Sequence, residues 1–412
     1  MSTRTATDVT RCSALFTLVY ASMGASGILG QPIASLTKDG LGLSAGQSAL
    51  FMALASAPTY LAPMYAFLSD AVPLLGARRR SYLLLGGLAG AVAWWCLGGV
   101  RTPTYALALA CLAAGLVAMD LATTVANGLM VEEGKPRGLT GVFQSIQWGA
   151  ANAASLVTTL VSGYLLAWFG GQAVFRWYAL CPLLVAVAAA VVVREPRRRR
   201  DADALPRAAA DLRAAASTPQ QWALAAFVFA WFFSPGLGAA LYYCQRDVLH
   251  FDPGFIGVLG AVFQGAGIGA ALLYNRVSRR QRMRRLLCAA VALGATGHMA
   301  YLLLSSRAAA LAVYALDGTL SMFAMLAVFD LAARAAPDGI EGTAFSVVRT
   351  ARVVATLSGG VLGGWLYETV GLQALIAISA GFTLACGLFV PLLPCAEDGA
   401  ARRQVAATPV AT

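Results

Sequence analysis

Four charged residues lie deep within long apolar stretches of the sequence: Asp120, Asp317, Arg349 and Arg352. An ionisable group at the centre of a membrane span costs roughly 2.5 to 3.5 kcal/mol, so such groups usually pair, face water or carry a function. The i, i+3 spacing of Arg349 and Arg352 places them on one face of a helix. Two interpretations stay open. An acid and an arginine could form a structural ion pair, or the arginines could bind an anionic solute while Asp120 or Asp317 carries a proton.

A polar stripe runs along the apolar stretch 139–169. Its members recur at steps of three and four residues, which places them on one side of a helix. They are Gln144, Gln147, Trp148, Asn152, Ser155, Thr159 and Ser162. Such a stripe faces either a neighbouring helix or a water-filled cavity. We favour a cavity wall, because amides donate and accept hydrogen bonds and an indole can stack on a flat ring.

A second aromatic group follows a break in the stretch 222–245. Ser234, Pro235 and Gly236 interrupt the apolar run, and Tyr242 and Tyr243 come shortly after them. Proline lacks a backbone N–H and glycine tolerates unusual dihedral angles. The segment is therefore either a bend that can act as a gate or a place of close packing through small residues. The two tyrosines are a second candidate stacking site for a ring.

Other chemistries lack the residues that they need. The chain has 2 His, and its 8 Cys form no C-x-x-C pair, so we expect neither a metal site nor a catalytic triad. We predict that the protein is not an enzyme and uses no cofactor. The net charge of +11 gathers at the ends of apolar runs without interleaved aromatic residues. This pattern favours contact with lipid headgroups and argues against nucleic acid as a partner.

The composition predicts an all-α membrane protein. Charged residues make up 12% of the 412 residues and apolar residues 59%, whereas soluble domains have roughly 25% and 45 to 50%. A helix that spans a membrane needs about 20 apolar residues, and we count twelve runs of this kind. They are 13–36, 48–69, 82–100, 105–131, 139–169, 174–193, 222–245, 254–274, 286–304, 309–333, 343–367 and 372–393.

A segment rich in Arg and Ala divides the runs into two sets of six. We predict an N-terminal half over 1–193, a linker over 194–221, a C-terminal half over 222–394 and a tail over 395–412. Most of the 30 Lys and Arg residues lie in the linker and in alternate loops. The positive-inside rule therefore places the linker and both termini in the cytoplasm. The composition is typical of a bacterium with a GC-rich genome, so we expect the cytoplasmic (inner) membrane. Two six-helix halves are the outline of a secondary transporter built from repeated halves.

Several motifs resemble the folate/biopterin transporter family of the major facilitator superfamily. The stretch Ala62–Leu85 contains Pro-x-Tyr, Ser-Asp, Pro-x-x-Gly and Arg-Arg-x-Tyr in the order that this family has. Later stretches that agree with the family are Gly128–Glu132, Gln144–Trp148, Pro235–Gly257, Leu273–Asn275 and Glu341–Phe345. The resemblance implies a twelve-helix facilitator that moves folates, pterins or related compounds, driven by protons.

The resemblance also implies a gate. The family's Asp at the end of the second helix corresponds to Asp70, which in such transporters pairs with the loop arginines and latches the cytoplasmic gate. The arginines here are Arg78, Arg79 and Arg80. Ala66 replaces a Gly of the family pattern, and Asn127 stands where many members have an Asp. Asp120 is a possible substitute for that acid.

The expected function is therefore a monomeric, proton-coupled transporter that moves an anionic, folate-like or pterin-like organic solute by alternating access. In this hypothesis Arg349 and Arg352 bind a carboxylate, the aromatic side chains stack on a ring, and Asp120 or Asp317 carries the proton. Two alternatives stay open. Val131-Glu132-Glu133 resembles facilitator-like assembly factors for pigment and light-harvesting proteins, and the same fold also serves exporters of other small organic solutes.

Overall fold

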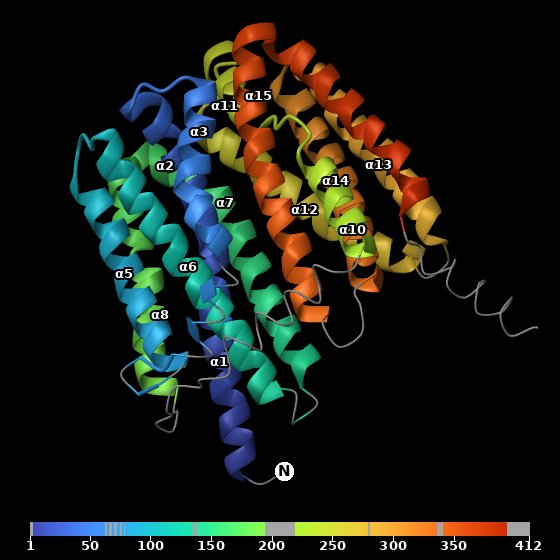
Figure 1. Ribbon diagram of the computed structural model, residues 1–412. Coiled ribbons are helices and arrows are strands. Elements are labelled where there is room, and N and C mark those ends of the chain that lie inside the picture. Colours follow the sequence, from blue (N-terminus) through green and yellow to red (C-terminus); the bar gives the residue numbers. More distant parts are fainter. Residues whose placement is uncertain are drawn as a thin grey trace, which may run out of the picture. The chain divides into compact units, whose positions relative to one another are not determined.

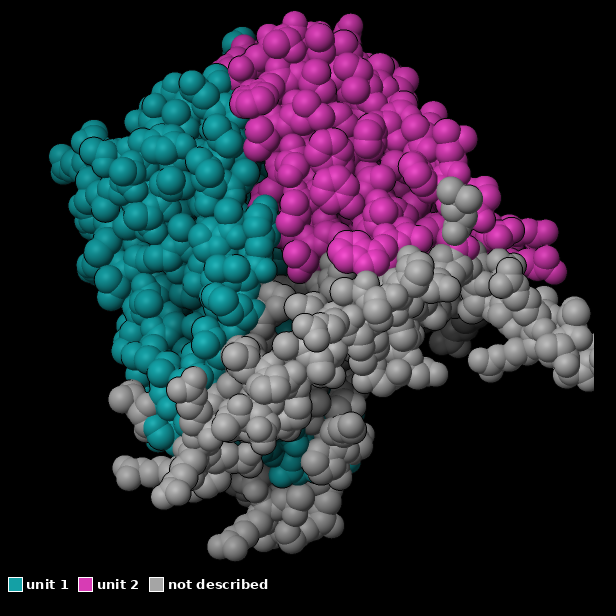
Figure 2. Space-filling model, in the orientation of Figure 1, with its two compact units in different colours: residues 1–208, 250–261 teal, residues 209–249, 262–412 magenta. Residues whose placement is uncertain are grey.

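The computed structural model describes residues 3–61, 64–65, 68–69, 72–74, 76–77, 79–134, 137, 139–193, 219–278, 281–335 and 341–393. Within these residues the secondary structure is helical and contains no strand (Figure 1). The prediction of an all-α protein is confirmed. By contact clustering, the chain divides into a first unit of residues 1–208 and 250–261 and a second unit of residues 209–249 and 262–412 (Figure 2).

The first unit contains the following helices, in which η denotes 3-10 or π turns. They are α1 (Thr3–Ala25), η1 (Ser26–Leu29), α2 (Gly30–Ser35), η2 (Leu36–Gly40), α3 (Ala45–Ser56), η3 (Ala57–Leu61), α5 (Arg79–Gly99), α6 (Tyr105–Gly134), α7 (Thr140–Tyr178) and α8 (Leu180–Val192). The second unit contains α10 (Pro219–Phe232), α11 (Gly238–Tyr243), η5 (Cys244–Val248), α13 (Met283–Ala300), η6 (Tyr301–Leu303), α14 (Arg307–Ala335), α15 (Glu341–Cys386) and η7 (Gly387–Leu392). Helix α12 (Pro253–Ser278) begins in the first unit and continues into the second.

Eight helical segments of the described chain are long and apolar enough to cross a membrane. Two of them, Ile146–Val192 and Thr350–Pro391, each contain a glycine with a positive φ angle. At Gly170 φ is 77°, and at Gly371 it is 79°, a conformation that glycine adopts readily and other residues rarely do. The chain reverses there, as α15 does in Figure 1, so each of these segments supplies two spans. Together with α3 and α10, the segments are consistent with the twelve predicted spans.

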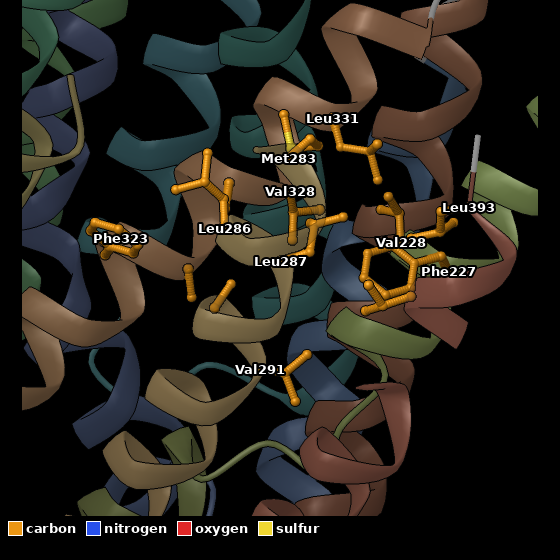
Figure 3. Packing of buried hydrophobic residues seen from close by; sticks show 14 of the residues in the cluster. Phe227, Val228, Met283, Leu286, Leu287, Val291, Phe323, Val328, Leu331 and Leu393 are labelled. Carbon is orange, nitrogen blue, oxygen red and sulfur yellow. The ribbon is translucent and has the colours of Figure 1, made fainter. Parts of the chain in front are cut away.

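Each unit packs around its own apolar core. In the first unit Leu15, Phe16 and Phe143 belong to a cluster of fully buried side chains from α1, α5, α6, α7 and α8. In the second unit Phe227 and Leu287 belong to a cluster from α10, α13, α14 and η7 (Figure 3). Because lipid tails are as apolar as these side chains, close van der Waals packing rather than water exclusion holds such helices together.

The first helix of each half ends in the same unusual way. η2 and η5 are π-helical turns, closed by hydrogen bonds from Leu41 N–H to the Leu36 carbonyl (2.8 Å) and from Leu249 N–H to the Cys244 carbonyl (3.0 Å). Each bond spans five residues instead of the usual four. A π turn is rare and inserts one extra residue into a helix.

The residues after the π turns also correspond. Gly42 and His250 both have positive φ, 64° and 51° respectively. Ser44 Oγ then accepts a hydrogen bond from Gln47 N (3.3 Å), and Asp252 Oδ1 accepts one from Phe255 N (2.8 Å). Both side chains cap the N-terminus of the next helix. The two halves therefore repeat a detailed local structure.

Candidate functional site

The predicted stacking residue Trp148 lies beside two polar residues of the first unit. The Tyr20 hydroxyl on α1 donates a hydrogen bond to Asn127 Oδ1 on α6, at 2.6 Å. The rings of Tyr20 and Trp148 meet edge to face, with 6.0 Å between their centroids. Tyr20 is buried, whereas 51% of Trp148 is exposed. Tyr20 therefore links the half-exposed indole of Trp148 to the side-chain amide of Asn127 and fixes the orientation of that amide.

The other members of the polar stripe on α7 differ in burial. Gln147 has no exposed area, and neither of its amide atoms has a hydrogen-bond partner among the described residues. Asn152 is exposed. The backbone of Gln144 is helical, but its side chain lies outside the described residues. The structure therefore brings Trp148 and Tyr20 together and places Gln147 on a buried face.

Asp317 is held in the interior of the second unit by hydroxyl groups. Tyr301 Oη donates to Asp317 Oδ2 at 2.8 Å, and Ser321 Oγ donates to Asp317 Oδ1 at 2.7 Å. Among the described residues, no arginine is paired with this carboxylate. Gly297 leaves room for it, because a Cβ there would lie 2.7 Å from Asp317 Oδ1. The described contacts of this carboxylate are therefore hydrogen bonds from neutral hydroxyl groups and not an ion pair.

A second polar contact lies next to this carboxylate. The Tyr301 ring packs edge to face against Tyr314, with 5.6 Å between the centroids. The hydroxyl of Tyr314 accepts a hydrogen bond from Gln245 Nε2 at 2.5 Å. Polar groups of η5, η6 and α14 thus line up inside the second unit.

Asp120, the other predicted proton carrier, is partly buried on α6. The Thr123 hydroxyl donates to its backbone carbonyl at 3.0 Å.

The guanidinium of Arg352 on α15 lies over the ring of Phe232, with 5.6 Å from Cζ to the ring centroid. A cation above an aromatic face is attracted by the ring quadrupole. The backbone of Arg349 is helical, but its side chain lies outside the described residues. Tyr242 and Tyr243 lie on α11, with their ring centroids 6.3 Å apart. Tyr242 is buried and Tyr243 is half-buried.

Arg79, one of the predicted gate arginines, is buried at the start of α5. Its Nη1 donates to Ser69 Oγ at 2.7 Å, and its Nη2 pairs with Glu132 Oε1 of α6 at 3.0 Å. Gly128 makes room for the guanidinium, because a Cβ there would lie 2.6 Å from Arg79 Cζ. Arg80 is exposed and donates to the Ala190 carbonyl at 2.8 Å. Asp70 and Arg78 lie outside the described residues.

The predicted bend between α10 and α11 is present. The chain is not helical at Ser234 and Pro235, and the N–H of Gly236 donates to the carbonyl of Gly359 on α15 at 2.8 Å. The hydroxyl of Ser379 donates to the Pro235 carbonyl at 2.8 Å. Backbone groups that the break frees are therefore satisfied by a neighbouring helix, as a membrane span requires.

Three contact residues did not emerge as functional candidates from the sequence. Tyr20 and Tyr301 lie in apolar runs whose periodicity gives no reason to single out one aromatic residue. Glu132 was visible within a family motif, but its partner Arg79 is far away in the sequence. Only the packing of α5 on α6 brings these two charges together.

Comparison with known proteins gives consistent matches along the chain. The BT1 family model matches residues 24–375. The folate-biopterin transporter of Synechocystis sp. is 30% identical over 411 residues, covering 92% of this chain and 81% of that protein. Folate transporter 2 of Plasmodium falciparum is 22% identical over 397 residues, covering 92% of this chain and 87% of that protein.

Solved structures of transporters share the fold. The nucleoside transporter NupG superimposes with a TM-score of 0.71 at 12% identity, covering 93% of this chain and 98% of that one. The D-xylose-proton symporter gives a TM-score of 0.71 at 14% identity, covering 94% of this chain and 99% of that one. At such low identity the likeness concerns the fold alone.

Proposed function

Because the chain belongs to the BT1 family, we propose that it is a secondary active transporter that moves a folate-like or pterin-like organic solute by alternating access, coupled to protons. The observation that carries this proposal is the likeness to the folate-biopterin transporter of Synechocystis sp. over 92% of the chain. The protein is a multi-pass membrane transporter with a major facilitator fold, and it is not an enzyme.

Proton coupling in this proposal uses Asp317. When ionised, the carboxylate accepts hydrogen bonds from Tyr301 and Ser321. When protonated, the acid keeps one acceptor oxygen and gains a donor, while the span loses its charge. The loss of charge lowers the electrostatic cost of this side chain in the membrane interior. Such a difference can bias the transporter between two conformations. Asp120 remains the alternative proton carrier.

Solute binding in this proposal uses both halves. Arg349 and Arg352 bind a carboxylate of the solute. Arg352 lies over the ring of Phe232, and the ring quadrupole holds the guanidinium there. Trp148 or the pair Tyr242 and Tyr243 stacks on an aromatic ring. The amides that donate and accept hydrogen bonds in this scheme are Gln144, Gln147 and Asn152.

The two halves extend over 1–193 and 222–394, with a basic linker over 194–221 and a tail over 395–412. We propose that the protein is a monomer in the cytoplasmic membrane, with both termini in the cytoplasm and its basic loops on anionic lipid. Asp70 with Arg78, Arg79 and Arg80 latches the cytoplasmic gate.

Uptake by proteoliposomes tests this function. Labelled folate and labelled pterin are offered separately, with and without an inward proton gradient. The proposal predicts accumulation of at least one compound that depends on the gradient. Asp317→Asn should abolish gradient-driven accumulation but retain exchange of solute across the membrane, because the neutral amide still fits the site. Folded wild-type protein without flux of either compound would refute the substrate class. If Asp317→Asn loses exchange because it no longer folds, Asp317 has a structural role.

A further inference from the structure

The buried amide of Gln147 has no structural role that the described contacts explain. The side chain has no exposed area, and neither amide atom is hydrogen-bonded within the described residues. A buried amide without partners destabilises a fold, and native proteins rarely keep one. Its retention inside a membrane span therefore points to a partner that is present in another state of the protein.

The packing of α1 against α7 shows what Gln147 faces. Phe143, one turn before Gln147, packs edge to face on Phe16 at 5.2 Å between centroids. Ala151, one turn after Gln147, touches α1 so closely that a Cβ on Gly24 would lie 2.8 Å from its carbonyl carbon. Gln147 therefore faces α1 midway between these two contacts.

Tyr20 lies at the same level on the facing helix. It is one turn after Phe16 and one turn before Gly24, so the periodicity of α1 directs it toward the same helix as these residues. Its hydroxyl is bonded to Asn127, and its ring touches Trp148. Four side chains with amide, phenol and indole groups thus gather at one level of α1, α6 and α7.

We propose that Tyr20, Asn127, Gln147 and Trp148 form a binding subsite for a flat heterocyclic ring with a lactam edge, that is, a ring N–H next to a ring C=O. This inference rests on the proposed function and specifies which part of the solute the N-terminal half binds. A side-chain amide offers one acceptor and one donor side by side, which is the complement of a lactam edge. Side-chain amides read nucleobase edges by the same paired geometry.

The neighbours of Gln147 have separate roles in this subsite. Trp148 offers a half-exposed indole face for stacking. Tyr20 occupies the oxygen of the Asn127 amide, so the NH2 group of Asn127 stays available as a donor. In the conformation described, Gln147 is closed off from solvent. Its amide therefore meets the ring only after α1 and α7 separate during the transport cycle.

Competition experiments separate ring binding from binding of the rest of the solute. Uptake of labelled folate into proteoliposomes is inhibited either by pterin, which has the ring, or by p-aminobenzoylglutamate, which lacks it. Gln147→Leu should raise the inhibition constant of pterin by about tenfold or more, as loss of paired buried hydrogen bonds does. The constant for p-aminobenzoylglutamate should stay within about twofold of the wild-type value. An equal rise for both compounds would contradict the inference.

Thermal unfolding distinguishes a role of Gln147 in binding the ring from a role in supporting the fold. Because Gln147 has no described partner, Gln147→Leu should unfold at the same temperature as the wild type or at a higher one. A lower unfolding temperature would show that the amide supports the fold, and would overturn the proposal. Two controls should leave pterin inhibition unchanged. Gln172→Ala removes an amide bonded to the Arg101 carbonyl, and Tyr178→Phe removes a hydroxyl bonded to the Ser22 carbonyl of α1.

Fluorescence tests the subsite without any transport. Pterin added to purified protein in detergent should quench part of the tryptophan emission, and Trp148→Phe and Gln147→Leu should reduce that quenching. If quenching depends on Trp148 but the protein takes up no folate, the subsite is supported and the transport proposal is refuted. Uptake without such quenching would retain the transport proposal and refute the subsite. No Trp148-dependent quenching under any condition overturns the inference.

Discussion

Gly363 on α15 is where the second unit tolerates a side chain least. A Cβ at this position would lie 2.6 Å from the backbone N and 2.8 Å from the backbone C of Gly236. Attractive contacts between such atoms begin at about 3.5 Å, so Gly363→Ala must push the chain at Gly236 away by about 1 Å. Backbone atoms cannot rotate out of the way as a side chain can. The displacement also stretches the bond from Gly236 N–H to the Gly359 carbonyl, now 2.8 Å.

The expected loss of stability follows from these two effects. Overpacking of this kind costs about 1 to 3 kcal/mol, and a lost backbone hydrogen bond costs about 0.5 to 1.5 kcal/mol. With an unfolding entropy of about 2.1 cal/mol/K per residue over 412 residues, a combined loss of about 3 kcal/mol should lower the unfolding temperature by roughly 3 to 4 °C. Thermal unfolding of the purified protein in detergent, followed by circular dichroism, measures the shift.

Gly360→Ala is the matched control, because nothing lies within 4 Å of a Cβ at Gly360 on the same helix. This substitution should leave the unfolding temperature unchanged or raise it, since Ala favours a helix over Gly by roughly 0.5 to 1 kcal/mol. If both substitutions shift the temperature equally, the close approach of α15 to Gly236 is not what limits this position.

Three further substitutions test other contacts. Gly128→Ala places a methyl group within 2.7 Å of the Arg79 guanidinium and should lower stability by about 1 to 3 kcal/mol, measured by thermal unfolding; an unchanged temperature would mean that Arg79 moves freely. Tyr301→Phe removes a hydroxyl that donates to the buried Asp317 and should lower stability by about 1 kcal/mol, measured by thermal unfolding; an unchanged temperature would mean that this bond does not support the fold. His250→Gly relieves a φ of 51° and should stabilise the protein by about 0.5 to 1 kcal/mol; destabilisation would indicate that the imidazole makes contacts that outweigh the strain.

The helical fold could be predicted from the sequence because the patterns that indicate helices are local. Apolar runs of about 20 residues indicate spans without knowledge of their neighbours. The break before α11 was visible for the same reason. Pro235 lacks the backbone N–H that a helix needs, and Gly236 adopts non-helical dihedral angles readily. The reversals at Gly170 and Gly371 were also expected, because Gly170 directly follows one predicted run and Gly371 directly precedes another.

The contacts of the candidate site were less accessible to sequence reasoning. Periodicity placed Gln147 and Trp148 on one stripe, yet consecutive residues of a helix point about 100° apart. The structure buries the first and exposes half of the second. Which side of α7 meets α1 depends on the packing of glycines such as Gly24 against a neighbour more than a hundred residues away. No local pattern contains that information, so Tyr20 and its bond to Asn127 became visible only in three dimensions.

The paired π turns at η2 and η5 have a consequence for the history of the chain. A π turn is rare in proteins. The same turn, followed by a residue with positive φ and a capping side chain, occurs at the corresponding place in both halves. Two independent origins would need to coincide in position and in the structure that follows, whereas duplication of a segment that already contained the turn accounts for both. After that event the halves diverged in backbone strain, because the first has Gly42 and the second has His250 at the matching position.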